Sequence, residues 1–163
     1  MSARSLGFGL LLGALLIAAG WPLLGCGHET IEPSPCGVHW PSYAGFGPGI
    51  IVGATTPNED EYAFSCGGAG APDWAYVWEP DLMGDYVLDT EGSGYDTVLG
   101  LMNEDCSMEL ACDDNGYRLS PGGLSQIIFH AELGQRYIIV VDGAGGEAGG
   151  FNIHVRRLGG SGP

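Results

Sequence analysis

The chain has 163 residues, enough for one domain with a leader and a linker. It carries 20 Asp and Glu against 5 Lys and Arg, a net charge of −15, and 45% of its residues are hydrophobic. This balance excludes a basic nucleic-acid-binding surface, since phosphate contacts need Lys and Arg. The hydrophobic content argues against a disordered chain, and the acidic surface favours solubility and attracts cations.

Residues 1–25 have the pattern of an export signal. Arg4 precedes an uncharged, mostly apolar run from residue 6 to 25, which is typical of a signal peptide but is also long enough for a retained membrane anchor. The sequence Leu-Leu-Gly-Cys that ends at Cys26 resembles the lipobox of bacterial lipoproteins. This resemblance implies that Cys26 becomes an acylated, membrane-anchored N-terminus, and Gly27 in place of Asp favours the outer membrane.

The rest of the chain divides into a linker, a domain and a short tail. Residues 26–48 are rich in Pro and Gly and show no regular period, so we expect a lipid-anchored linker there. Residues 159–163 are expected to form a flexible tail. Short apolar or alternating runs between glycine-rich turns fill residues 49–158, which predicts an antiparallel β-sandwich or barrel. These runs are 50–52, 74–78, 85–89, 95–102, 124–131, 135–141 and 151–156.

Four cysteines remain when Cys26 is assigned to the lipid. An even number in an exported chain indicates disulfides, and four cysteines allow three connectivities. Cys106 and Cys112 are close enough in sequence to close a small loop, which would leave Cys36 to pair with Cys66. The alternative of a metal site is weaker, because there is no Cys-x-x-Cys motif and no nearby pair of histidines.

Residues 74–78 form an aromatic stripe. Trp74, Tyr76 and Trp78 alternate along a predicted strand and would share one face. Core packing is the default interpretation, and an exposed platform that binds a glycan or peptide through Trp74 and Trp78 is the sharper alternative. In the last predicted strand, the same alternation directs Phe151, Ile153 and Val155 inward and His154 outward.

The order of these motifs is similar to that of a known family. Asp-Trp-Ala-Tyr-Val-Trp (73–78) leads to Gly-Asp-Tyr-Val-Leu-Asp-Thr (84–90) and then to Gly-Tyr-Asp-Thr-Val-Leu (94–99). Cys-Asp-Asp-Asn (112–115) and Val-Val-Asp-Gly (140–143) follow. Over roughly residues 49–157 the chain resembles the bacterial pre-peptidase C-terminal domain, in the version common in myxobacterial lipoproteins. The resemblance implies a jelly-roll-like β-sandwich with a non-catalytic, accessory role and, in some relatives, binding of calcium or matrix polymers.

Several aspartates follow or precede the predicted strands. Strand ends of a sandwich meet in one layer of loops, so these carboxylates are candidate ligands for Ca²⁺, which prefers six to eight oxygens. The alternative is that Asp89 and Asp113 cap turns by accepting backbone N–H groups. Asp142, before Gly143, looks more like a hairpin residue than a ligand. The candidate ligands are Asp73, Asp89, Asp96, Asp113 and Asp114.

Catalysis has little support in the sequence. His130 and His154 both fall inside predicted strands, and neither Gly-x-Ser-x-Gly nor His-Glu-x-x-His occurs. We therefore expect no enzyme, no catalytic residue and no nucleic-acid partner. The leading hypothesis is a lipid-anchored envelope module that binds an extracellular polysaccharide or protein and is stabilised by Ca²⁺; the alternatives are a structural spacer and, less favoured, a secreted hydrolase.

Overall fold

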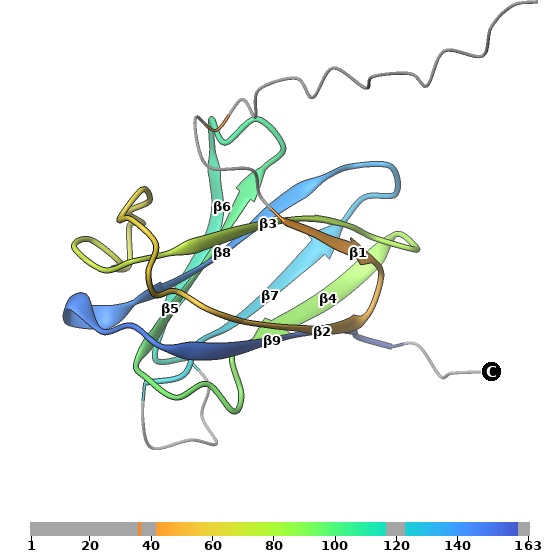
Figure 1. The fold of residues 1–163 in the computed structure, drawn as a ribbon. Coiled ribbons are helices and arrows are strands. Elements are labelled where there is room, and N and C mark those ends of the chain that lie inside the picture. Colours follow the sequence, from red (N-terminus) through yellow and green to blue (C-terminus); the bar gives the residue numbers. More distant parts are fainter. Residues whose placement is uncertain (1–35, 37–41, 117–122, 160–163) are drawn as a thin grey trace, which may run out of the picture. The chain divides into compact units, whose positions relative to one another are not determined.

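The computed structural model describes residue 36, residues 42–116 and residues 123–159. Cys26, the predicted signal and the predicted tail beyond residue 159 lie outside these ranges. Within them, nine strands and one short 3₁₀ turn are arranged as shown in Figure 1. The elements are β1 (Ser42–Phe46), β2 (Gly49–Ala54), β3 (Trp74–Glu79), β4 (Gly84–Asp89), β5 (Thr97–Asn103), β6 (Glu109–Asp114), β7 (Gln126–Ala131), β8 (Tyr137–Gly143), η1 (Ala144–Gly146) and β9 (Gly150–Arg157). No helix in the described ranges has the length and apolar character needed to cross a membrane.

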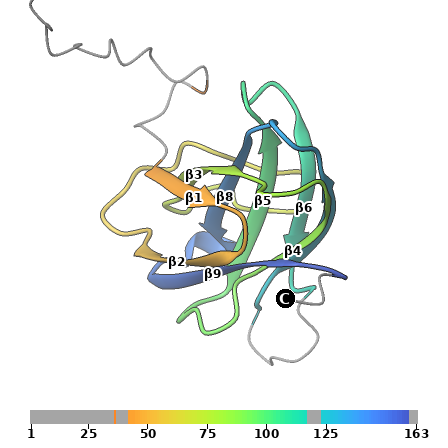
Figure 2. The ribbon, with the colours of Figure 1, turned by 90° about the vertical axis from the view of Figure 1, so that its right-hand side faces the viewer.

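The strands form two facing sheets, so the all-β sandwich expected from the sequence is confirmed. The five-stranded sheet has the order β1-β3-β8-β5-β6 and the four-stranded sheet the order β2-β9-β4-β7. Figure 2 shows the two layers. Every pair of neighbouring strands is antiparallel except β1 and β3, which run parallel.

Two strands lie where the sequence predicted none. β1 falls in the predicted linker, yet it pairs with β3, and the Gly47 N–H donates to the Glu79 carbonyl at 2.9 Å. β6 is an edge strand, and its side chains are exposed or half-buried. Neither segment carries the regular apolar run that marks the other strands, including β2 and β7 at the edges of the other sheet.

The main core lies between the sheets and is built from the inward face of each strand. Phe151, Ile153 and Val155 are buried, as the alternation in β9 predicted. Trp78 is 1% exposed and packs edge-on against Tyr86, with ring centroids 4.9 Å apart. Its indole Nε1 donates to the Gly47 carbonyl at 2.8 Å, which satisfies the polar atom of a large buried side chain.

A second, smaller core lies on the outer face of the five-stranded sheet. There Tyr62 and Phe64, from the segment before β3, cluster with Val98, Ile138 and Val140. Phe64 packs against Gly100, where an added Cβ would lie 2.1 Å from the phenyl ring. The glycine in the middle of β5 is therefore needed for close packing of this covering segment.

Two disulfides also tie segments onto this side of the domain, and their pairing differs from the predicted one. Cys36 pairs with Cys106 and Cys66 with Cys112, with Cα atoms 5.1 and 5.9 Å apart. The expected Cys106–Cys112 bridge is wrong because Cys106 lies in the β5–β6 turn, whereas Cys112 lies well along β6 opposite Gly100. Each strand residue advances the chain by about 3.3 Å, which takes the two Cα atoms beyond the roughly 7 Å that a disulfide spans.

Buried hydroxyl groups join the two sheets at one end. Thr90, after β4, and Thr97, in β5, are fully buried, and their Oγ1 atoms are 2.6 Å apart. The Ser125 N–H donates to Thr90 Oγ1 at 2.9 Å, and the Ser125 hydroxyl donates to the Thr97 carbonyl at 2.5 Å. These bonds explain why threonine follows Asp89 and Asp96 in the repeated Asp-Thr motif, and they hold both aspartates at this end of the domain.

Candidate cation site

The structure gathers three of the five predicted ligands on one side of the domain. Asp73 precedes β3, Asp96 precedes β5 and Asp114 ends β6, all in the five-stranded sheet. Asp89 belongs to the four-stranded sheet, and Asp113 points away from Asp114 toward β7. All five aspartates lie at the same end of the sandwich, but their carboxylates are divided between different contacts.

Asp142, which the sequence interpretation set aside as a hairpin residue, lies among the gathered carboxylates. In the strand register Asp114 is opposite Val98, and Val98 is opposite Asp142. Trp74 is opposite Val141, so Asp73 follows next to Asp142 on the adjacent strand. Because side chains alternate along a strand, Asp142 shares the outer face with Ile138 and Val140. That alternation was visible in the sequence and could have placed Asp142 under the covering segment.

Asp73 and Asp142 are both buried, and their environments raise the pKa of each. Asp73 is 3% exposed and Asp142 is fully buried. Burial raises the pKa of Asp73 to about 6, although the hydrogen bonds from two backbone N–H groups stabilise the charged form and act to lower it. Burial raises the pKa of Asp142 to about 7, with further contributions from the negative charges of Asp73 and Asp60. Removal of the carboxylates from water is thus the larger cause, and mutual repulsion adds to it.

The hydrogen bonds of these two carboxylates are unequal. Asp73 Oδ2 accepts the N–H groups of Glu61 and Tyr62, each at 2.7 Å. Asp142 Oδ1 accepts the Gly143 N–H at 2.7 Å, whereas its Oδ2 is buried without a hydrogen-bond partner in the described structure. The ion pairs among the described residues involve neither Asp73 nor Asp142.

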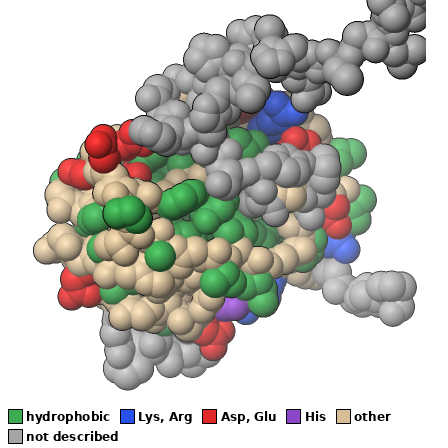
Figure 3. Space-filling model, viewed as in Figure 1, with side chains coloured by type: hydrophobic (Ala, Val, Ile, Leu, Met, Phe, Trp, Pro, Cys, Tyr) green, Lys and Arg blue, Asp and Glu red, His purple; other side chains and the backbone are tan. Residues whose placement is uncertain are grey.

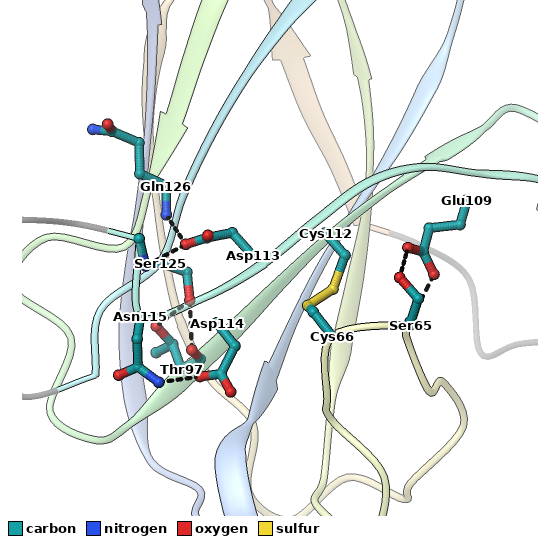
Figure 4. Close-up of a disulfide and its surroundings, with 11 residues drawn as sticks. Ser65, Cys66, Thr97, Glu109, Cys112, Asp113, Asp114, Asn115, Ser125 and Gln126 are labelled. Atoms are coloured by element: carbon teal, nitrogen blue, oxygen red, sulfur yellow. Dashed lines mark hydrogen bonds between the residues drawn. A yellow bond between two sulfur atoms is a disulfide. The ribbon is translucent and has the colours of Figure 1, made fainter.

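A glycine pair lies against these oxygens. A Cβ added to Gly68 would lie 2.3 Å from Asp142 Oδ2, and the backbone there has φ +90°, so glycine is required on both grounds. A Cβ on Gly67 would lie 3.2 Å from Val98 and 3.7 Å from Asp114 Oδ2. The neighbouring Cys66–Cys112 bridge, drawn beside Asp114 in Figure 4, fixes this segment to β6.

This donor set fits a hard cation. It consists of carboxylate oxygens without a basic partner in the described part of the chain, and two of these oxygens, Asp96 Oδ1 and Asp142 Oδ2, are buried without a hydrogen-bond donor. In Figure 3 acidic side chains also gather at the left, where the segment before β3 and the turn after β8 lie. Calcium takes carboxylate oxygens of this kind, so the donor types suit it, whereas the three ligand atoms that already lie within 4.8 Å of one another in the described residues belong to Asp89, Glu91 and His154.

Asp89 forms a different arrangement on the outer face of the four-stranded sheet. It is fully buried, its Oδ1 lies 3.0 Å from His154 Nδ1, and its Oδ2 forms an ion pair with Arg156. Ligand atoms of Asp89, Glu91 and His154 all lie within 4.8 Å of one another, close enough to hold a metal ion. Arg156 already supplies a positive charge to Asp89, so a cation would have to compete with it.

Asp113 has the contacts of a turn-capping residue. Its Oδ2 accepts the N–H groups of Gly116 at 2.7 Å and Gln126 at 2.8 Å, and Figure 4 shows it turned toward Gln126. Asp89 likewise accepts the Glu91 N–H at 3.2 Å. Asp89 and Asp113 thus both accept backbone N–H groups, as the capping alternative expects.

The other candidates also have defined surroundings. His130 is exposed, and its Nδ1 lies 2.7 Å from Asp85 Oδ1. In the described part of the chain, no serine or threonine hydroxyl hydrogen-bonds to His130 or His154. Trp78 occupies the core and Trp74 packs partly buried against the same cluster, so Trp78 offers no surface to a ligand in this structure.

No protein-family model matches the chain, and no curated protein matches it. Among solved structures, it is similar to the pre-peptidase C-terminal domain of collagenase from Bacillus anthracis, determined at 1.0 Å. The similarity has a TM-score of 0.48 at 14% identity and covers 73% of this chain and 99% of that one. That structure carries the name of the family that the motifs resemble.

Proposed function

We propose that the protein is a non-catalytic module of the cell envelope that binds an extracellular polysaccharide or protein. Two disulfides support a location outside the cytoplasm, since such bridges persist in oxidising compartments. The acidic net charge of −15 makes a nucleic-acid partner unfavourable. The resemblance of the motifs to an accessory domain supports a non-catalytic role.

The outer face of the four-stranded sheet carries this proposal. Ile50 and Val52 on β2 are 65% and 70% exposed, and Ile128 on β7 is 61% exposed. In the register Ile50 is opposite His154 and Val52 is opposite Asn152, so apolar and hydrogen-bonding side chains alternate across the face. Figure 3 shows exposed hydrophobic side chains on the side of the domain along which β2 runs.

Such a surface suits a ligand with both apolar and hydroxyl or amide groups. Isolated exposed apolar residues are common, but here they lie on one sheet face beside an amide and an imidazole. Binding on this face does not require an opening in the core, because outward side chains of a sheet contact a ligand without disturbing the inward ones.

The test is a screen of extracellular polysaccharides and matrix proteins followed by surface variants. Val52→Asp and Ile128→Asp should abolish binding of any ligand found while leaving the thermal unfolding midpoint nearly unchanged. Leu133→Asp is the matched control, because Leu133 is 62% exposed in the β7–β8 turn. Equal binding by all three variants would refute this face as the binding surface, and absence of any ligand in the screen would favour a structural spacer.

Membrane attachment is the second component of the proposal. The lipobox-like sequence supports acylation of Cys26, and Gly27 supports sorting to the outer membrane. Incorporation of a labelled fatty acid by the natural chain and its loss in Cys26→Ala would support the anchor. Labelling that persists in the variant would contradict it.

Stabilisation by calcium is the third component. The gathering of Asp73, Asp96 and Asp114 on one side of the five-stranded sheet supports it. A cation present at a hundredfold over its Kd should add about 2.7 kcal/mol to the free energy of unfolding. Identical thermal unfolding midpoints in EDTA and in millimolar Ca²⁺ would contradict stabilisation by calcium.

A further inference from the structure

We propose that Asp142 and Asp73 form the core of a Ca²⁺ site between the five-stranded sheet and the Gly67–Gly68 segment, which the Cys66–Cys112 bridge holds closed. This inference rests on the calcium component of the proposed function. It replaces a general set of aspartates with one location and one central ligand, Asp142, which the sequence had not suggested.

The strand register supplies the first argument. Trp74 and Val141 are opposite one another on β3 and β8, so the next residues, Asp73 and Asp142, are also neighbours on the same face. Asp60, from the covering segment, adds a third negative charge that acts on both carboxyl groups. Asp60 Oδ2 accepts the Gly70 N–H at 3.0 Å, which keeps this carboxylate on the covering segment.

The free oxygen of Asp142 supplies the second, independent argument. The residue is fully buried, and Oδ2 has no hydrogen-bond partner in the described structure. A buried polar atom without a partner costs about 1–3 kcal/mol, and more when it is charged, so such an atom is rare unless something binds it. A divalent cation would supply both the missing contact and the opposite charge.

The covering segment supplies the third argument. Only a residue without a side chain can approach Asp142 Oδ2 as Gly68 does, since a Cβ there would lie 2.3 Å away. Calcium also accepts backbone carbonyl oxygens as ligands. Cys66, two residues earlier, is bonded to Cys112 on β6, so the segment cannot lift from the sheet while the bridge is intact.

The experiment measures Ca²⁺ binding to the full chain by isothermal titration calorimetry at pH 7.5. Asp142→Asn keeps the size of the side chain and removes its buried charge, so it should fold and lose at least tenfold in Ca²⁺ affinity. Asp73→Asn is the second variant and should weaken binding as well. Asp85→Asn is the matched control, because Asp85 is an exposed aspartate on the other sheet.

The outcomes separate this inference from the proposal on which it rests. Loss of affinity in Asp142→Asn with full affinity in Asp85→Asn, and weaker binding in Cys66→Ala/Cys112→Ala, supports the site and its closure. Wild-type affinity in Asp142→Asn, with native circular dichroism, overturns the site but leaves calcium binding elsewhere intact. Absence of Ca²⁺ binding by the wild-type chain overturns both the site and the calcium component, while the ligand screen still tests the binding role.

Discussion

Replacement of Arg156 by Gln should destabilise the protein much more than the exposure of this side chain suggests. Arg156 is 51% exposed, but its partner Asp89 is fully buried. After the replacement, Asp89 keeps the contact with His154 Nδ1 and the Glu91 N–H, and its second oxygen loses the guanidinium. Loss of one partner of a buried pair costs about 3–5 kcal/mol, whereas an exposed pair contributes about 0–1 kcal/mol. Because Arg156 is half-exposed, we expect the replacement to lower the free energy of unfolding by about 2–3 kcal/mol.

A matched replacement isolates the burial of the partner as the cause. Arg136 is 54% exposed, and it pairs with Glu79 at 2.8 Å and Glu104 at 3.4 Å, neither of which is fully buried. Arg136→Gln should therefore cost no more than about 1 kcal/mol. The free energy of unfolding of both variants is measured in urea at pH 7.5, with tryptophan fluorescence as the probe. Equal, small losses in the two variants would refute the argument that the buried Asp89 charge needs its guanidinium.

Three further changes test the fold and its charges. Trp78→Ala should lower the free energy of unfolding by about 3–5 kcal/mol, measured in urea, because it leaves a cavity in the core; a loss below 1 kcal/mol would contradict the burial. Cys66→Ala/Cys112→Ala removes a link across 46 residues and should cost about 4 kcal/mol, and peptide mapping without reductant should find these two cysteines joined in the wild-type chain. Zn²⁺ should raise the unfolding midpoint of Arg156→Gln more than that of the wild type, because the guanidinium no longer competes for Asp89; an equal response would count against that competition.

The class of fold and most of the strands follow from local patterns in the sequence. Alternation in residues 151–156 predicts which side chains enter the core, because the period of two is a local property of an extended chain. Glycine-rich turns between short apolar runs predict a sandwich for the same local reason. The strands β1 and β6 escaped prediction because their segments carry no regular apolar run, and the side chains of β6 are exposed or half-buried.

The pairing of the cysteines and the grouping of the carboxylates depend on contacts between segments that are distant in the sequence. Cys66 is 46 residues from Cys112 in the sequence, and local sequence patterns do not show that two residues so far apart lie close together in space. The Asp-Thr motifs at 89–90 and 96–97 look alike in the sequence. Asp89 nevertheless pairs with Arg156 on the four-stranded sheet, whereas Asp96 lies near Asp114 beside the five-stranded sheet. Asp142 gains its importance from the register of β8 with β3 and from the segment that covers it. Local patterns specify what each strand exposes and buries, whereas the charge that a buried carboxylate faces depends on strands far away in the chain.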